Sequence, residues 1–148
     1  TTYHRIMFGL SIMNFFVALA AGLSTIPAPR DTPGVLAFGN TLTCDIQGFI
    51  SMFISGAFLY NFFLSVHYCL MICFNIHEDT ISKRIEPIMH LLALGWPTVT
   101  AIVGQFLKLY NFAERQCWLA PYPAGCAEND EVECTRGINA YDFRWIFQ

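Results

Sequence analysis

The sequence predicts an all-α fold, a transmembrane helical bundle with three full spans and the start of a fourth. Of the 148 residues, 55% are hydrophobic and 13% are charged, whereas charged residues make up about 25% of an ordinary soluble domain. The charged residues gather in a few short segments between long apolar runs. Three of these runs are long enough to cross a bilayer, which favours a membrane protein over a soluble domain with a large core.

The first expected span covers residues 6–26, which include no charged residue. Tyr3 and Arg5 precede it, and both residue types suit a headgroup boundary. Small residues in its second half permit close approach of a neighbouring helix. Pro27 then ends the helix, and we expect residues 27–45 to form an outer loop.

The second expected span, residues 46–76, is the element around which the others are organised. At 1.5 Å per residue it would be about 45 Å long, more than the ~30 Å hydrocarbon core, so it must tilt or project from the bilayer. With about 100° between successive residues, its polar side chains fall within roughly 140° of arc. A span that faced only lipid would gain nothing from this grouping, so we place it at the centre of the bundle. The polar residues of this arc are Gln47, Ser51, Ser55, Asn61, Ser65, Tyr68, Cys69 and Cys73.

An inner loop over residues 77–87 is expected to precede the third span, residues 88–108. Pro97 lies inside this span, where neighbouring helices can satisfy the carbonyl that it frees, and we expect a kink there. Residues 111–144 are polar and rich in turn residues, so we expect a second outer loop. Trp145 opens the apolar start of a further span, and we expect the chain to be a segment of a longer protein.

The cysteines predict which side of the membrane each loop occupies. Three spans place both outer loops on one side, and that side holds Cys44, Cys117, Cys126 and Cys134, whereas residues 1–5 and 77–87 hold no cysteine. Disulfides confined to an oxidising exterior sort in this way. We therefore expect an integral protein of the plasma membrane, with Cys44 and residues 111–144 extracellular. Four cysteines admit three pairings, among which the sequence alone does not select.

Cys44, the Cys117-Trp118 pair and Gly95-Trp96-Pro97 carry a family resemblance. The chain resembles the middle of a seven-transmembrane G protein-coupled receptor of the secretin-like and cyclic-AMP-receptor-like group, from the second span to the start of the fifth. In that fold, a cysteine at the outer end of the third span pairs with a cysteine of the second outer loop. The resemblance implies a Cys44–Cys117 disulfide, and we expect Cys126 to pair with Cys134.

The resemblance also implies a function, which is to transduce an extracellular ligand by rearranging helices, with a heterotrimeric G protein as the inner partner. The residues expected to face the ligand cavity are Gln47, Ser51, Ser55 and Trp118. For the first three, hydrogen bonding between helices is an equally good interpretation. The residues expected to contact a partner at the inner face are His77, Glu78, Lys83 and Arg84.

Other functional classes have less support. A four-span scaffold of tetraspanin or claudin type, binding partners through its disulfide-bearing outer loop, is the alternative, although the Cys-Cys-Gly element of tetraspanins is missing. A transporter is disfavoured because the spans carry no formal charge except Lys108 at the end of the third. The chain lacks the metalloprotease, serine-hydrolase and phosphate-loop motifs, so we expect neither an enzyme nor a cofactor or metal site. A net charge of -3 gives no reason to expect nucleic acid binding.

Overall fold

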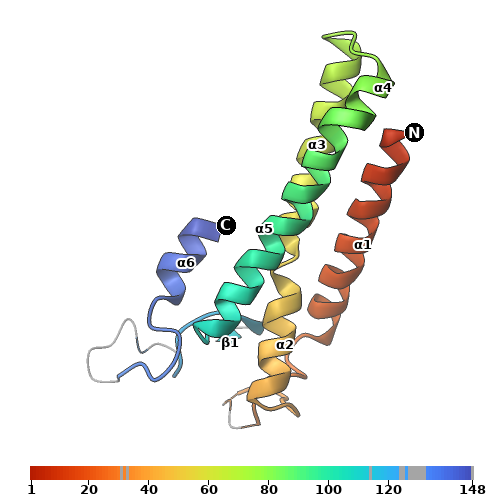
Figure 1. Ribbon diagram of the computed structural model, residues 1–148. Helices are drawn as coiled ribbons and strands as arrows, with labels where there is room; N and C mark the ends of the chain where they lie inside the picture. The colour runs from red at the N-terminus through yellow and green to blue at the C-terminus, as the bar shows by residue number, and fades with distance from the viewer. Residues whose placement is uncertain (31, 33, 114, 124–125, 127–132, 148) are drawn as a thin grey trace.

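The computed structural model describes residues 1–30, 32, 34–113, 115–123, 126 and 133–147. Most of this chain is helical, which confirms the expected all-α class, and the long helices run up and down in an elongated bundle (Figure 1). Three helical stretches are long and apolar enough to cross a membrane: Thr2–Leu23, Thr41–Ile72 and Glu78–Phe106. Their elements are α1 (Thr2–Leu23), α2 (Thr41–Ser51), α3 (Ile54–Ile72), α4 (Glu78–Thr80), η1 (Ile81–Ile85) and α5 (Glu86–Phe106).

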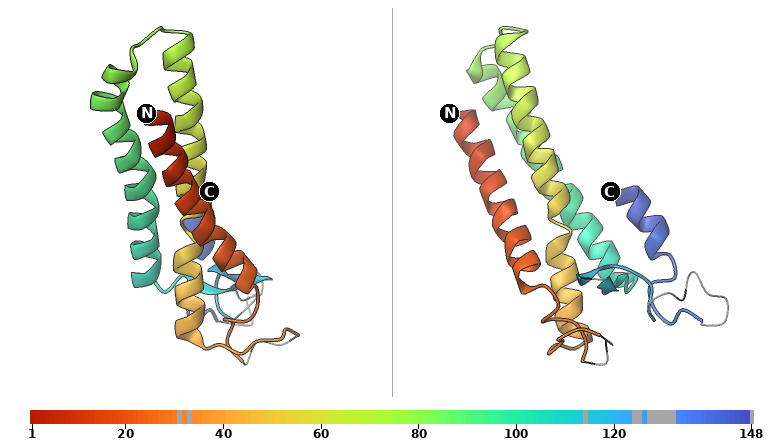
Figure 2. Two further views of the ribbon diagram at one scale, coloured as in Figure 1. Left: turned by 90° about the vertical axis from the view of Figure 1, so that its right-hand side faces the viewer. Right: turned by 180° about the vertical axis from the view of Figure 1, so that it is seen from behind.

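The second stretch lies in the middle of the bundle, as expected. Helix α3 packs against both α1 and α5, whereas α1 and α5 have little contact with each other (Figure 2). The chain starts at the end of the bundle where α4 lies, here called the α4 end. The opposite end carries a β-hairpin and the start of the last helix, and is here called the hairpin end.

The middle stretch, α2 followed by α3, is here called the middle rod. It differs from the continuous helix expected over residues 46–76. It begins at Thr41, because Asn40 and Thr43 form a capping box in which each side chain accepts the backbone N–H of the other. A tightened turn separates α2 from α3, where the N–H of Phe53 donates to the carbonyl of Ile50, three residues back, at 3.1 Å. Helix α3 then ends at Ile72.

The prediction of an inner loop over residues 77–87 is also wrong, because the chain is already helical from Glu78. Glutamate, lysine and arginine are good helix formers, so this polar segment adds a helical extension to the third span. The turn η1 is π-helical, and the N–H of Glu86 donates to the carbonyl of Ile81, five residues back. Only residues 73–77 remain outside helices between α3 and α4.

The segment expected as a loop over residues 111–144 holds regular structure at both of its ends. Strands β1 (Tyr110–Ala113) and β2 (Gln116–Leu119) form an antiparallel hairpin in which Asn111 faces Trp118. Helix α6 begins before Trp145 and covers Ala140–Phe147. Residues 114, 124–125 and 127–132 of this expected loop, and residues 31 and 33 of the loop expected over residues 27–45, lie outside the described chain.

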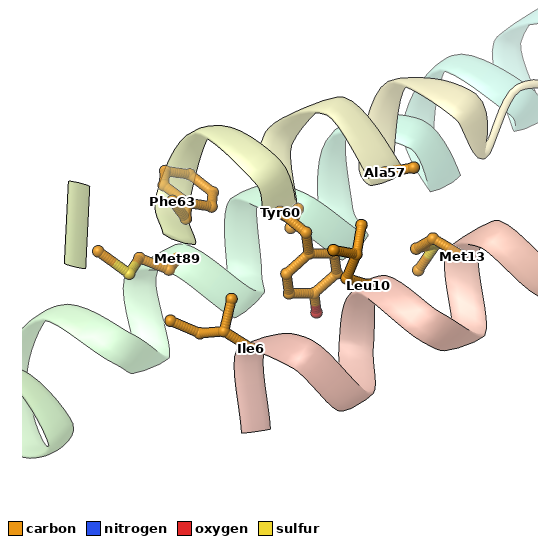
Figure 3. Packing of buried hydrophobic residues seen from close by; sticks show 8 residues of the cluster. Ile6, Leu10, Met13, Ala57, Tyr60, Phe63 and Met89 are labelled. Atoms are coloured by element: carbon orange, nitrogen blue, oxygen red, sulfur yellow. The ribbon is translucent and has the colours of Figure 1, made fainter. Parts of the chain in front are cut away.

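An apolar core joins the three spans near the α4 end (Figure 3). Tyr60 of α3 lies at its centre and is 1% exposed. A Cβ atom at Gly9 of α1 would lie 2.6 Å from the Tyr60 ring, so the tyrosine occupies space that any larger residue at position 9 would need. The remaining core residues are Ile6, Leu10, Met13, Ala57, Phe63, Met89 and Ala93.

Helices α3 and α5 approach each other closely at Gly56. A Cβ atom there would lie 2.8 Å from the carbonyl oxygen of Ala93 and 3.2 Å from Cγ of Pro97. Pro97 has no N–H, so the carbonyl of Ala93, four residues earlier, lacks its helical hydrogen bond. The absence of a side chain at Gly56 lets the α3 backbone meet this carbonyl directly.

We expect Gly56→Ala to destabilise the protein, because the added methyl group meets main-chain atoms that cannot rotate away. Overpacking of this kind costs about 1–3 kcal/mol. Gly95→Ala in α5 is the matched control, since a Cβ atom there meets nothing within 4 Å. Thermal unfolding in the same detergent compares the two variants, and equal unfolding midpoints would contradict the close approach at Gly56.

Candidate functional site

A disulfide ties the start of the middle rod to the hairpin. Cys44 in the first turn of α2 bonds Cys117 of β2 across 73 positions of sequence, with the two Cα atoms 5.2 Å apart. Both cysteines are almost fully buried. A second disulfide joins Cys126 to Cys134. The two bonds match the expected pairing.

Gln47 lies one turn beyond Cys44 and fixes the same junction by hydrogen bonds. Its side-chain amide is buried and donates to the carbonyls of Ala20 and Ser24 at the end of α1, at 2.9 and 2.8 Å. Its carbonyl oxygen accepts the N–H of Cys117 at 3.0 Å. One side chain therefore joins α1, α2 and β2, and it uses both ends of its amide to do so.

The serines expected beside Gln47 also have protein partners. Ser51 Oγ donates to the carbonyl of Gln47 at 2.9 Å, and Ser55 Oγ donates to that of Met52 at 2.9 Å. The bonds of Gln47 to Ala20 and Ser24 are of the interhelical kind that stood as the alternative to ligand contact, whereas those of Ser51 and Ser55 run to carbonyls three or four residues earlier in the same span. A ligand role for Gln47, Ser51 and Ser55 therefore stays a prediction.

The side chain of Tyr110 in β1 packs between α2 and α5. Cβ atoms at Gly48 of α2 and Gly104 of α5 would each lie 2.6 Å from its side chain. Its hydroxyl donates to the carbonyl of Ala101 at 2.9 Å. Burial, with the charge of Asp45 adding to it, raises the pKa of the Tyr110 phenol above its usual range, so this donor stays protonated.

Charged side chains connect the hairpin end to α6 and to the segment before it. Arg136 Nη2 donates to the carboxylate of Asp45 at 3.0 Å, which links the segment before α6 to α2. The guanidinium of Arg144 lies 5.1 Å from the ring centroid of Trp118, a cation–π distance. The indole N–H of Trp118 is buried and has no hydrogen-bond partner among the described residues. Trp118 thus packs against Arg144 of α6, and its indole N–H has no acceptor among the described residues.

A pocket of about 320 Å³ opens between α1 and α2 at the hairpin end. Its walls are mostly apolar, and Ala20, Leu23 and Ile50 contribute to them. Gln47 also lines it, but the amide is already bonded as described. The pocket can take an apolar group without offering a free polar contact from Gln47.

The α4 end holds a polar cluster of which only Glu78 was a candidate site residue, here called the Glu86 cluster: Thr2, Arg5, Glu78, Ser82 and Glu86. Glu86 is 4% exposed and accepts Thr2 Oγ1 at 2.9 Å and Arg5 Nη2 at 2.7 Å, while Arg5 Nε binds its other oxygen. Arg5 Nη2 also donates to Ser82 Oγ at 2.6 Å. The cluster therefore joins α1 to the start of α5 through a nearly buried carboxylate.

Glu78 completes the cluster by capping α1 from another helix. Thr1 gives α1 no side-chain cap, and Glu78 Oε1 instead accepts the N–H of Thr2 at 2.9 Å. A carboxylate at a helix N-terminus also meets the positive end of the helix dipole. One clue was available in the sequence, since Arg5 and Glu86 stand at the starts of two apolar runs that reach the same end of the bundle.

His90 extends this polar chain into the core. Its Nε2 lies 3.6 Å from Glu86 Oε1, and its Nδ1 shares a hydrogen bond of 2.8 Å with the hydroxyl of Tyr60. Tyr60 belongs to α3 and His90 to α5. Polar contacts therefore connect all three spans near the α4 end.

The residues expected to contact an inner partner do not act as one group. His77, Lys83 and Arg84 are exposed, whereas Glu78 is half-buried and engaged with Thr2. His67 of α3 is buried, and its Nδ1 has no partner among the described residues. Cys69 and Cys73, which belong to the polar arc expected along the second span, are exposed free thiols. The described residues form no cluster of three or more metal-binding side chains.

Comparison with known protein families, with curated proteins and with solved structures finds no match to this chain. A functional assignment therefore depends on the residues and the geometry described above.

We expect Gln47→Met to destabilise the hairpin end, because it leaves the N–H of Cys117 and two α1 carbonyls without Gln47 as a partner. Each buried group left unpaired costs about 1–3 kcal/mol. Gln105→Met in α5 is the control, because Gln105 is exposed. Thermal unfolding of both variants is the measurement. A Gln47→Met midpoint no lower than that of Gln105→Met would show that these hydrogen bonds add nothing.

We expect Arg5→Gln and Glu86→Gln each to lower the unfolding midpoint, since either change removes one partner of an ion pair with a nearly buried carboxylate. Combined, the two changes should cost less than the sum of the single effects, because the second removes a group already left unpaired. Asp79→Asn, at an exposed position of α4, is the control. Additive effects in this cycle would argue against direct coupling between Arg5 and Glu86.

Proposed function

We propose that this chain is the core of a membrane signalling receptor of the G protein-coupled receptor-like class, covering the second to fourth spans and the start of the fifth. The observation that carries the proposal is the Cys44–Cys117 disulfide. It joins the outer start of the middle span to a β-hairpin in the following loop, which is the connection that the family resemblance implies. The three apolar stretches support placement in a membrane, and we assign the hairpin end to the extracellular side of the plasma membrane.

The surface of α3 supports a larger bundle than these spans alone. Asn61, Ser65 and Tyr68 are exposed along one side of a helix that is long and apolar enough to cross a bilayer. Asn61 and Ser65 donate to carbonyls of their own helix at 3.0 and 3.2 Å, and polar side chains at membrane depth also favour neighbouring protein or a wet cavity over lipid. We infer that further spans of the full-length protein cover this stripe.

Signalling would be a shift between two packings of the helices. A ligand bound under the hairpin shifts the population toward the packing for which it has the higher affinity. Cys44 and Gln47 couple the hairpin to α1 and α2, and the Glu86 cluster holds α1 against α5 at the opposite end. Loosening of the Glu86 cluster would then move α1 relative to α5 and change the inner surface near Lys83 and Arg84, which are already exposed, that a G protein would contact.

The test uses the full-length protein in cells with a panel of G protein activation reporters and a library of extracellular ligands. We expect at least one G protein to respond, in proportion to the amount of receptor at the surface. Cys44→Ser combined with Cys117→Ser should lose ligand response, because the hairpin is then held by non-covalent contacts alone. Asp79→Asn is the matched control for expression.

Two results would contradict the proposal. One is a signal equal to that of cells without the receptor for every G protein and ligand. The other is labelling of Cys69 and Cys73 in intact cells by a membrane-impermeant thiol reagent, because these free thiols should react only after permeabilisation. A count of four spans in the full-length protein would instead favour the tetraspanin- or claudin-like scaffold.

A further inference from the structure

His90 of α5 lies between the Glu86 cluster and the apolar core. Its Nδ1 shares a hydrogen bond of 2.8 Å with the hydroxyl of Tyr60, which is 1% exposed. Its Nε2 lies 3.6 Å from Oε1 of Glu86, one helical turn earlier. Each ring nitrogen therefore faces an oxygen atom. The His90 side chain is nevertheless 27% exposed, so the ring can exchange protons with water.

The contacts of His90 favour one form of its neutral ring. A neutral imidazole donates from one nitrogen and accepts at the other, and a carboxylate only accepts. Nε2 therefore carries the proton toward Glu86, and Nδ1 accepts the hydroxyl proton of Tyr60. At 3.6 Å, Nε2 is too far from Glu86 for a hydrogen bond, so the neutral ring stabilises the carboxylate little. A proton added at Nδ1 would instead place a full positive charge beside a side chain that is 4% exposed.

Arg5 and His90 approach the same carboxylate from different helices. Arg5 belongs to α1, and its Nε binds Oε1 of Glu86 while its Nη2 donates to Oε2 at 2.7 Å. His90 belongs to α5 and follows Glu86 by four residues, so an ion pair between them stays within one helix. Pairing of Glu86 with Arg5 joins α1 to α5, whereas pairing with His90 joins no second helix.

The other titratable side chains around this junction do not supply Glu86 with a cation. On α3, the phenol of Tyr60 is neutral near pH 7, and His67 forms no ion pair with a described carboxylate. On α4, Glu78 adds a negative charge. On α1, His4 is exposed and its Nδ1 bonds the hydroxyl of the first residue. Among the described residues, Arg5 and His90 are therefore the cationic partners of Glu86.

We propose that His90 is a pH-dependent second cation for Glu86, which takes over this carboxylate in acid and so weakens the hold of Glu86 on Arg5. Imidazole groups in general gain their positive charge between about pH 8 and pH 5. In acid, the charge of Glu86 is then balanced from within α5, and the ionic contact between α1 and α5 contributes less to stability. The switch depends on these contacts and not on the receptor function proposed above.

The experiment uses the full-length protein and measures how far Arg5→Gln lowers the thermal unfolding midpoint at about pH 8 and at about pH 5.5. In this variant the protonated ring of His90 is the remaining cation beside Glu86. Protonation therefore favours its folded state, and the variant regains stability as the pH falls. We expect the loss at the lower pH to be at most about half of the loss at the higher pH. His90→Gln can still bond Tyr60 but cannot become charged, and should make the loss caused by Arg5→Gln equal at both pH values.

Two further variants complete the test. His77→Gln removes an exposed imidazole at the same end of the bundle, and should leave the pH dependence of the Arg5→Gln loss unchanged. His90→Lys places a permanent charge beside Glu86, and should make that loss small at both pH values, which tests the proposal even if His90→Gln does not fold.

The proposal is overturned if Arg5→Gln lowers the midpoint equally at both pH values, or if the difference persists in His90→Gln. Unfolding is measured without a ligand or a G protein, so failure of this switch and failure of the receptor proposal are distinguishable.

Discussion

The covalent link between Cys44 and Cys117 is the constraint on which the hairpin end depends. It closes a loop of 73 positions, and closing a loop of that size stabilises a fold by about 4 kcal/mol through chain entropy. The side chains of Gln47 and Tyr110 add non-covalent contacts at the junction that the disulfide forms. Gln47 satisfies the N–H of Cys117, and Tyr110 fills the space left by Gly48 and Gly104. Removing the link would leave two buried hydrogen-bonding residues to hold the hairpin.

The two ends of the bundle are stabilised by different chemistry. At the hairpin end, a covalent bond, neutral hydrogen bonds and the Asp45–Arg136 ion pair hold the chain. At the α4 end, the same helices are held by Arg5, Glu86 and their polar neighbours, and Arg5 remains half exposed. Ionic contacts that water can reach are weaker and more easily exchanged than a disulfide. The hairpin end therefore depends on a covalent bond, and the α4 end on an ion pair with a nearly buried carboxylate.

The coarse architecture could be predicted from the sequence because hydrophobic run length and cysteine placement are strong signals. These signals predict three spans, place the second span in the middle of the bundle, and group four cysteines at one end. The errors lie where local chemistry overrides run length. Asn40 caps a helix that starts before the apolar run, and the polar segment after His77 forms a helical extension. The hairpin has only four residues in each strand, too few for a clear alternation.

The hydrogen bond from Thr2 to Glu78, together with the Arg5–Glu86 pair, has a consequence for biogenesis. The first helix emerges from the ribosome long before the acidic residues that satisfy its amino-terminal end. Glu86 follows Arg5 by 81 positions, so this ion pair can form only after the segment that begins α5 has been synthesised.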